Sequence, residues 1–351
     1  MAVFNLPVNS VSFGQVSTGL LREAFRRIKE EGEDDQHYLI PIGGSIDLDT
    51  QKEDREFSKW VVDTIQKPEL NKAWDKSATT VKLWHLNYES FSFPTSSNRK
   101  LISFYELDKP TPAELNIIKN ADKVFFTSDF TVKLFRSLGC DNIEYLPLFF
   151  DSHNFHQTNK SYHQDDRISF NLVGKFEKRK HHLKALKAWC KRFGGDKKYF
   201  LNCSIYNHFL SQEENNAALS EVFSGKEKPF NTNFLPWMKE NQVYNDYLNS
   251  ADIVIGMSGG EGWGLPEFHS VAMGSHAVVL NCNGYQSWAN EKNSVLVNPV
   301  GTEPAHDGRF FIEGRPYNQG NIFTWKEDEF IAACEEAIKR VEENRVNQEG
   351  L

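Results

Sequence analysis

A glycine-rich loop between two short apolar runs, within residues 251–281, constrains the fold of this chain more than any other feature. Residues 253–255 (Ile-Val-Ile) and 277–280 (Ala-Val-Val-Leu) are typical of buried parallel strands. The loop at 258–264 has four glycines in seven positions, so its backbone can approach a ligand closely. A helix should begin near Leu265, because Pro266 is tolerated in a first turn. The sequence therefore predicts strand, loop and helix, with an anion site at the helix N-terminus.

One carboxylate, Glu261, lies inside this loop. A carboxylate would repel a bare phosphate, so we expect Glu261 to face a group rich in hydroxyls, such as a sugar. The segment Glu-Gly-Trp-Gly-Leu-Pro at 261–266, followed by Ala-Met-Gly at 272–274, resembles the donor-sugar motif of one enzyme family. That family is the retaining nucleotide-sugar glycosyltransferases of the GT-B fold, which includes glycogen synthase-like and bacterial glycan-building enzymes.

The resemblance implies a catalytic role for Glu261, which would contact donor-sugar hydroxyls. It also implies that the loop and the helix start bind the donor, through Gly260, Gly262, Trp263, Gly264 and Leu265. In the family a second glutamate, eight positions after the first, holds the nucleotide ribose. Here that position is His269, and an additional acid, Glu267, falls two residues earlier. We expect His269, or Glu267 in its place, to contact the ribose.

A second pattern follows a predicted strand at 168–174 that ends in Gly174. The family carries Gly-Arg and then a lysine five residues after the arginine. Lys175 and Lys180 occupy these two positions here, and the resemblance implies that Gly174 and the two cations bind the donor diphosphate. Cations aimed at a leaving diphosphate stabilise the transition state more than the ground state. The alternative is a solvated basic helix start, which is unfavourable without an anion.

The length of 351 residues suggests two domains. Apolar runs of strand length alternate with helical segments, which predicts an α/β chain built from parallel βαβ units. The resemblance implies two Rossmann-like domains facing a central cleft. We assign residues 1–152 to an acceptor domain, 168–329 to a donor domain, and the polar segment between them to a linker. By the same resemblance, a last helix at about 330–351 should cross back to the first domain.

Three residues of the first half are further candidates. Gly14 follows the first predicted strand, and the resemblance implies that it approaches the donor; a plain turn glycine is the alternative. His85 and Glu106 lie at the C-terminal ends of two other predicted strands, at 81–86 and 101–106, and polar residues at such positions point into the ligand crevice of open α/β sheets. We therefore place them on the acceptor side, although single polar residues at strand ends are more often structural.

Composition excludes some classes of protein. A net charge of −8 gives no global reason to expect nucleic acid or an acidic membrane surface. The five cysteines lack metal-ligand spacing and are typical of buried thiols in a reducing compartment. No apolar run is long enough to span a membrane. We expect a cytoplasmic protein without a metal site, because lysines and loop amides can replace a divalent cation.

The resemblance implies transfer of a hexosyl or pentosyl group, with retention and without a required metal, from a UDP-, GDP- or ADP-sugar, and we expect a soluble hydroxyl as the acceptor. The acceptor could be a saccharide, a small molecule, or a hydroxymethylated base in DNA. For DNA, Arg309 and Arg315 in a proposed lid at 302–321 would supply cations. A non-catalytic nucleotide-sugar-binding module is a rival reading. A dehydrogenase is another, but the sequence lacks the G-x-G-x-x-G fingerprint for NAD.

Overall fold

A computed structural model describes residues 2–34, 36–66, 78–94, 97–158, 166–207, 209–223 and 227–351. The first half contains β1 (Ala2–Val8), α1 (Ser12–Arg26), a π-helical turn η1 (Arg27–Glu31), β2 (His37–Ile46), α2 (Arg55–Gln66), β3 (Thr79–Leu83), a 3₁₀ turn η3 (Tyr88–Phe91), β4 (Arg99–Ser103), α3 (Pro112–Asn120), β5 (Lys123–Phe126), α4 (Asp129–Ser137) and β6 (Ile143–Tyr145). These strands form one parallel sheet in the order β2-β1-β3-β4-β5-β6.

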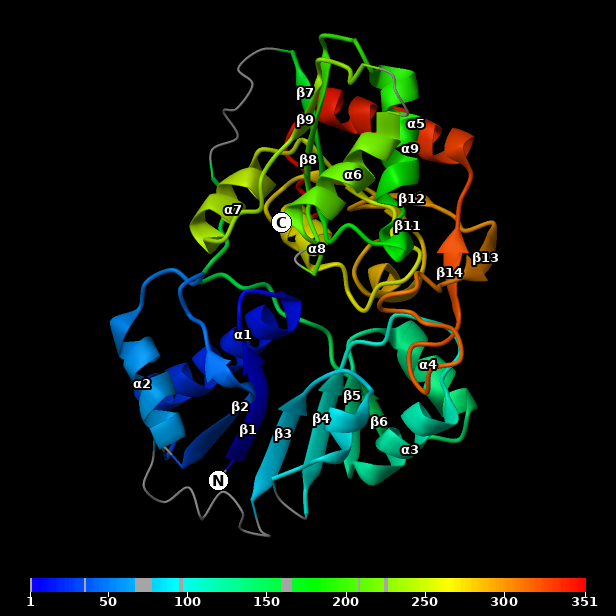
Figure 1. Cartoon of the computed structure of the whole chain (residues 1–351). Coiled ribbons are helices and arrows are strands. Elements are labelled where there is room, and N and C mark those ends of the chain that lie inside the picture. Colours follow the sequence, from blue (N-terminus) through cyan, green and yellow to red (C-terminus); the bar gives the residue numbers. More distant parts are fainter. Residues whose placement is uncertain are drawn as a thin grey trace.

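A second parallel sheet follows, in the order β12-β11-β10-β7-β8-β9. Its half of the chain contains β7 (Ile168–Gly174), a 3₁₀ turn η4 (Lys178–Lys180), α5 (His182–Phe193), β8 (Tyr199–Ile205), α6 (Gln212–Phe223), β9 (Thr232–Phe234), α7 (Asn241–Asn249), β10 (Ile253–Gly256), α8 (Leu265–Ala272), β11 (His276–Leu280), a 3₁₀ turn η5 (Asn283–Ser287), β12 (Val295–Val297) and α9 (Glu327–Glu343). Figure 1 shows the two sheets in separate lobes, which confirms the predicted α/β class with two Rossmann-like units.

Both faces of each sheet carry a hydrophobic core, because neighbouring residues of a strand point to opposite faces. In β10, for example, Ile253 and Ile255 pack on the side of α5 and α9, whereas Val254 packs on the side of α7 and α8. In the first sheet, Leu101 of β4 packs with α3 and α4, and Ile102 packs with α1 and α2. This two-sided burial explains why the strands read as continuous apolar runs in the sequence.

The last helix does not lie where we expected. Phe330, Cys334 and Ala337 of α9 are buried in the core of the second sheet, with Phe170 of β7. The residues after α9 stay on the same lobe, since Asn347 N donates to Gly274 O at 2.9 Å. The expectation that α9 crosses back to the first domain is therefore wrong, and Figure 1 shows this red helix on the second lobe.

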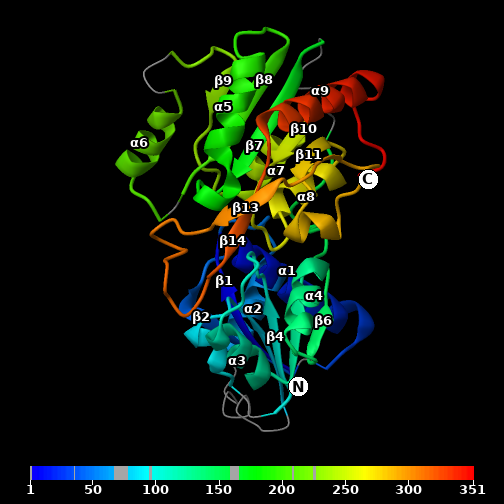
Figure 2. The same cartoon turned by 90° about the vertical axis from the view of Figure 1, so that its right-hand side faces the viewer.

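A different segment crosses between the lobes. Residues 301–324, here called the arm, begin with β13 (Gly301–Pro304) and end with β14 (Asn321–Thr324), which pair as an antiparallel hairpin. Figure 2 shows the arm reaching from the second lobe to the first. Its side chains Ala305, Phe311 and Ile322 are buried in the core formed by α3, α4 and the first sheet. The segment at 302–321, which the sequence suggests as a lid over the acceptor, is thus packed into the first domain.

The start of α3 shows how local sequence prepares the surface that receives the arm. Thr111 caps α3 by accepting from Glu114 N at 3.2 Å, and Glu114 accepts from Thr111 N at 2.8 Å. This reciprocal capping box holds the Glu114 carboxylate in place. Its second oxygen accepts from the backbone N of Asn318 in the arm, at 2.8 Å. One helix cap therefore also anchors the crossing segment.

Candidate active site

The candidate site lies where the order of the second sheet reverses. β7 and β10 are neighbours, and the chain leaves them toward opposite sides of the sheet. Open α/β sheets bind ligands at such a switch point, outside the carboxyl ends of the strands. Gly174 ends β7, with a positive φ of 122°, and Lys175 follows it. The loop with Glu261 follows β10, so the two sequence patterns meet at this point.

The glycines of the loop are required by close packing against both lobes. Gly264 precedes α8 with φ of 86°, a conformation that favours glycine. A Cβ at Gly260 would lie 2.8 Å from the backbone O of Glu106, and a Cβ at Gly262 would lie 2.6 Å from Cβ of Phe104. We predicted these glycines from close approach to a ligand. The structure shows that the partner in close contact is the first domain.

A buried network of charges surrounds Glu261, which is 5% exposed. Its Oε1 pairs with Lys180 Nζ and, at 3.0 Å, with NH1 of Arg179. Lys175 pairs with Glu177, which also accepts from Nε of Arg179 at 2.8 Å. Lys175 and Lys180 thus join Glu261 in one cluster of ion pairs, and their binding to a donor stays a prediction.

The neighbours of these groups shift their pKa values. Burial raises the pKa of Glu261, but Lys180 and Arg179 outweigh burial and bring it to about 2. Burial, aided by Arg179, lowers the pKa of Lys175 to about 8. Glu261 is therefore ionised at all ordinary pH values, whereas Lys175 titrates just above neutrality.

We expect the affinity for UDP to fall about tenfold per pH unit above pH 8. Lys175 loses its charge as the pH rises through its lowered pKa of about 8, and only the cation attracts a diphosphate. The measurement is calorimetric titration of UDP between about pH 7.5 and 8.8, above the titration of the terminal phosphate and below that of the uracil ring. The Lys175→Arg variant should bind with little pH dependence, because a guanidinium stays charged. An equal fall in both proteins would show that Lys175 is not the titrating group.

The first domain contributes two predicted residues to the same cluster. Glu106 Oε1 pairs with NH2 of Arg179 at 3.0 Å. The His85 ring packs on Phe13 with 4.2 Å between centroids, and the residue is exposed. Partial desolvation by the neighbouring residues, with the charges of Lys175 and Arg179, lowers the pKa of His85 to about 4, so the ring is neutral at pH 7. Both acceptor-side candidates therefore face the donor-side cations.

The helix α8 carries two buried groups at the ribose position of the motif. His269 donates from Nδ1 to Leu265 O at 2.8 Å, and its ring lies 4.4 Å from that of Phe155. Glu267 accepts from Tyr285 OH at 3.1 Å, and burial raises its pKa to about 7. Among the described residues, His269 Nε2, Glu267 Oε2 and Trp263 Nε1 are buried without a partner. Such atoms call for a ligand or water.

Gly14 lies at the start of α1, where a Cβ would meet the backbone O of Asn9 at 2.2 Å. Its glycine is thus explained by the packing of the preceding loop, and its approach to a donor stays a prediction. Arg179 and Glu177 belong to the cluster but are not indicated by the spacing of Lys175 and Lys180. The signal was present in the sequence as the basic run 178–180 behind an acid.

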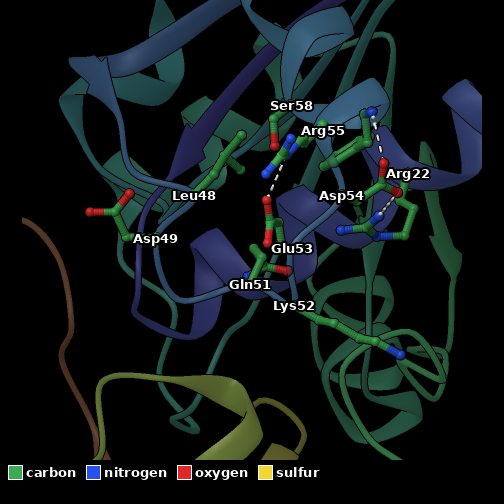
Figure 3. Close-up of a pocket in the computed structure, with 10 residues that line it drawn as sticks. Arg22, Leu48, Asp49, Gln51, Lys52, Glu53, Asp54, Arg55 and Ser58 are labelled. Atoms are coloured by element: carbon green, nitrogen blue, oxygen red, sulfur yellow. Dashed lines mark hydrogen bonds and ion pairs between the residues drawn. The ribbon is translucent and has the colours of Figure 1, made fainter.

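One hollow lies beside this cluster, and another lies away from it on the first domain. One, of about 560 Å³, opens beside the start of α5 and includes Glu177, Lys178 and His182 in its wall. The other, of about 360 Å³, lies on the first domain between Arg22 of α1 and residues 48–58. Figure 3 shows Arg22 paired with Asp54 there. This second hollow contains none of the predicted site residues.

Within the described residues, no group of three or more His, Cys, Asp or Glu side chains gathers as a metal site would require. Metal independence stays a prediction. No helix in the described ranges has both the length and the apolar character needed to cross a membrane.

No protein-family model matches the chain, and no curated protein matches its sequence. Solved structures do match. Sucrose-phosphate synthase from Thermosynechococcus elongatus aligns with a TM-score of 0.61 and 13% identity, over 99% of this chain and 92% of that one. WaaG, a glycosyltransferase of lipopolysaccharide biosynthesis, gives 0.59 and 10%, over 100% and 94%. Anabaena HepE, solved with UDP and glucose, gives 0.57 and 11%, over 99% and 92%. The chain therefore has the two-domain GT-B fold of these glycosyltransferases.

Proposed function

We propose that this chain is a metal-independent retaining glycosyltransferase that moves a sugar from a nucleotide-sugar to a hydroxyl of a soluble acceptor. The observation that carries the proposal is the cluster of Lys175, Arg179 and Lys180 around Glu261, set beside the start of α8. The first amides of a helix have no partner within it and favour an anion. Cations and amides at one point are what a leaving diphosphate needs.

The other groups of the cleft fit a donor and an acceptor on opposite sides. The unpartnered His269 Nε2 can accept a hydrogen bond from one ribose hydroxyl, and Glu267 can accept one from the other. In the family a single carboxylate accepts from both. Glu261, ionised and buried, suits sugar hydroxyls and a developing positive charge at the anomeric carbon. His85 and Glu106 face this point from the first domain. HepE, which shares the fold, has been solved with UDP and glucose.

A donor panel tests the proposal. UDP-, GDP- and ADP-glucose are incubated with the chain, and release of the nucleoside diphosphate is followed without acceptor, with oligosaccharides, and with DNA containing hydroxymethylated pyrimidines. We expect one donor to be consumed faster with a saccharide, and NMR of the product to show retained anomeric configuration. Release should persist in EDTA, because protein cations take the place of a metal ion. No release from any donor, or loss of activity in EDTA, would contradict the proposal.

The dependence of the transfer rate on salt concentration distinguishes a DNA acceptor from a saccharide acceptor. Binding to a phosphate backbone weakens steeply as the salt concentration rises, so transfer to DNA that falls with added salt would identify a nucleic-acid acceptor. Transfer to a saccharide should be insensitive to salt over the same range.

A further inference from the structure

The guanidinium of Arg179 contacts three acidic side chains and one backbone carbonyl. Its Nε donates to Glu177 at 2.8 Å, and its NH1 donates to Gly260 O at 2.6 Å and to Glu261 at 3.0 Å. Its NH2 pairs with Glu106 at 3.0 Å. Of the three acids, only Glu106 comes from the first domain. Its ion pair with NH2 of Arg179 therefore joins the two lobes at this cluster.

The three acids differ in how easily they can leave Arg179. The side chain of Glu177 is 2% exposed and that of Glu261 is 7% exposed, whereas that of Glu106 is 26% exposed. A carboxylate that already touches water regains its hydration at the lowest cost. The pKa of Glu106 is raised, because its attraction to Arg179 does not fully compensate for the partial desolvation of the carboxylate. Glu106 is thus the acid that can leave Arg179 at the lowest cost.

Within the network of ion pairs the charges already balance. The cations Lys175, Arg179 and Lys180 face the anions Glu106, Glu177 and Glu261, which gives three of each sign, and the nearby Glu267, with a pKa of about 7, adds partial negative charge. A diphosphate that entered the intact cluster would leave a buried excess of negative charge, which is costly. The excess is reduced if one carboxylate moves away from the cations.

We propose that a donor diphosphate displaces Glu106 from Arg179, and that the released carboxylate then accepts a hydrogen bond from the acceptor hydroxyl. Donor binding therefore precedes acceptor binding, because Glu106 is occupied until the diphosphate arrives. His85, neutral and open to the cleft beside the same cations, lines the space that the acceptor enters. This inference rests on the proposed function and assigns Glu106 a positioning role in it.

The first test is binding, with UDP, GDP and ADP as probes in calorimetric titrations. Because Glu106 competes with the diphosphate for Arg179, Glu106→Gln should bind the preferred nucleotide at least tenfold more tightly than the wild type. Glu106→Ala should do the same, and thermal unfolding of both variants checks that they fold. The matched control is Glu144→Gln, which removes a half-exposed carboxylate paired with Lys123 in the same domain. Its affinity should stay within twofold of wild type.

The second test separates a role of Glu106 in positioning the acceptor from a role in breaking the bond between sugar and diphosphate. In Glu106→Gln, release of nucleoside diphosphate without acceptor should continue, whereas transfer should fall at least tenfold, with a raised KM for the acceptor. Unchanged or weaker nucleotide binding in both Glu106 variants would overturn the inference, as would unchanged transfer. Tighter binding in the Glu106 variants, with no sugar transfer by the wild type, would support the displacement and contradict the proposed function instead.

Discussion

Lys180→Ala should lower kcat/KM for donor consumption by about 10² to 10³, equivalent to about 3–4 kcal/mol of transition-state stabilisation. Lys180 is 7% exposed and pairs with Glu261, so its charge acts in a site that holds little water. Charges in such a site are worth far more than in solution. Steady-state kinetics with the preferred nucleotide-sugar give the measurement.

The matched control for this variant is Lys191→Ala. Lys191 lies on α5, and its exposed side chain pairs with Glu327 at 2.6 Å, outside the hollow beside the cluster. Its loss should change kcat/KM by less than twofold. If Lys180→Ala also stays within threefold of wild type, the cluster does not bind the leaving group.

Glu261→Ala should lower the free energy of unfolding by about 3–5 kcal/mol, because removing one partner of a buried charge network leaves the others uncompensated. Arg179 and Lys180, both 7% exposed, would lose the carboxylate that they share. Urea denaturation measures the loss. Glu144→Ala, at a half-exposed surface pair, should change stability by less than about 0.5 kcal/mol.

Added UDP should stabilise Glu261→Ala more than it stabilises the wild type, since a bound diphosphate supplies the negative charge that the variant lacks. Thermal unfolding with and without UDP gives this comparison. A stability loss below about 1 kcal/mol would show that Glu261 does not neutralise the buried cations.

The local pattern of the sequence was sufficient to predict individual elements. The strand at 168–174 has the predicted bounds, because it has a continuous apolar pattern and ends in a glycine, and α8 begins at Leu265 as its proline and glycine signals predict. The spacing of Lys175 and Lys180, and the motif around Glu261, are also informative, because each resembles a pattern of a known family. Each of these patterns lies within one short stretch of the chain.

Contacts between distant segments could not be read in the same way. The apolar face of α9 indicates burial but does not say which lobe receives it, and the resemblance suggested the wrong one. The arm has apolar residues at 305, 311 and 322 without a regular period, so nothing in its sequence predicts docking on the first domain. The ion pairs of Arg179 with Glu106 and Glu261 are equally hard to predict, because these two acids lie on loops far from Arg179 in the chain.

The glycines of the loop illustrate the same limit in physical terms. A glycine at 260 or 262 indicates that something comes very close to the backbone, but not what it is. The sequence favoured a ligand, and the structure shows Phe104 and the backbone of Glu106. These contacts press the loop that carries Glu261 against the first domain.

The decisive experiment is a crystal structure of the chain with the nucleoside diphosphate of its preferred donor. We expect the diphosphate beside Lys180 and Lys175, with phosphate oxygens within hydrogen-bond distance of Lys180 Nζ and of the amides at the start of α8. That nucleotide bound elsewhere, for example in the hollow beside Arg22, with the charged cluster unchanged, would contradict the assignment of this cleft as the donor site.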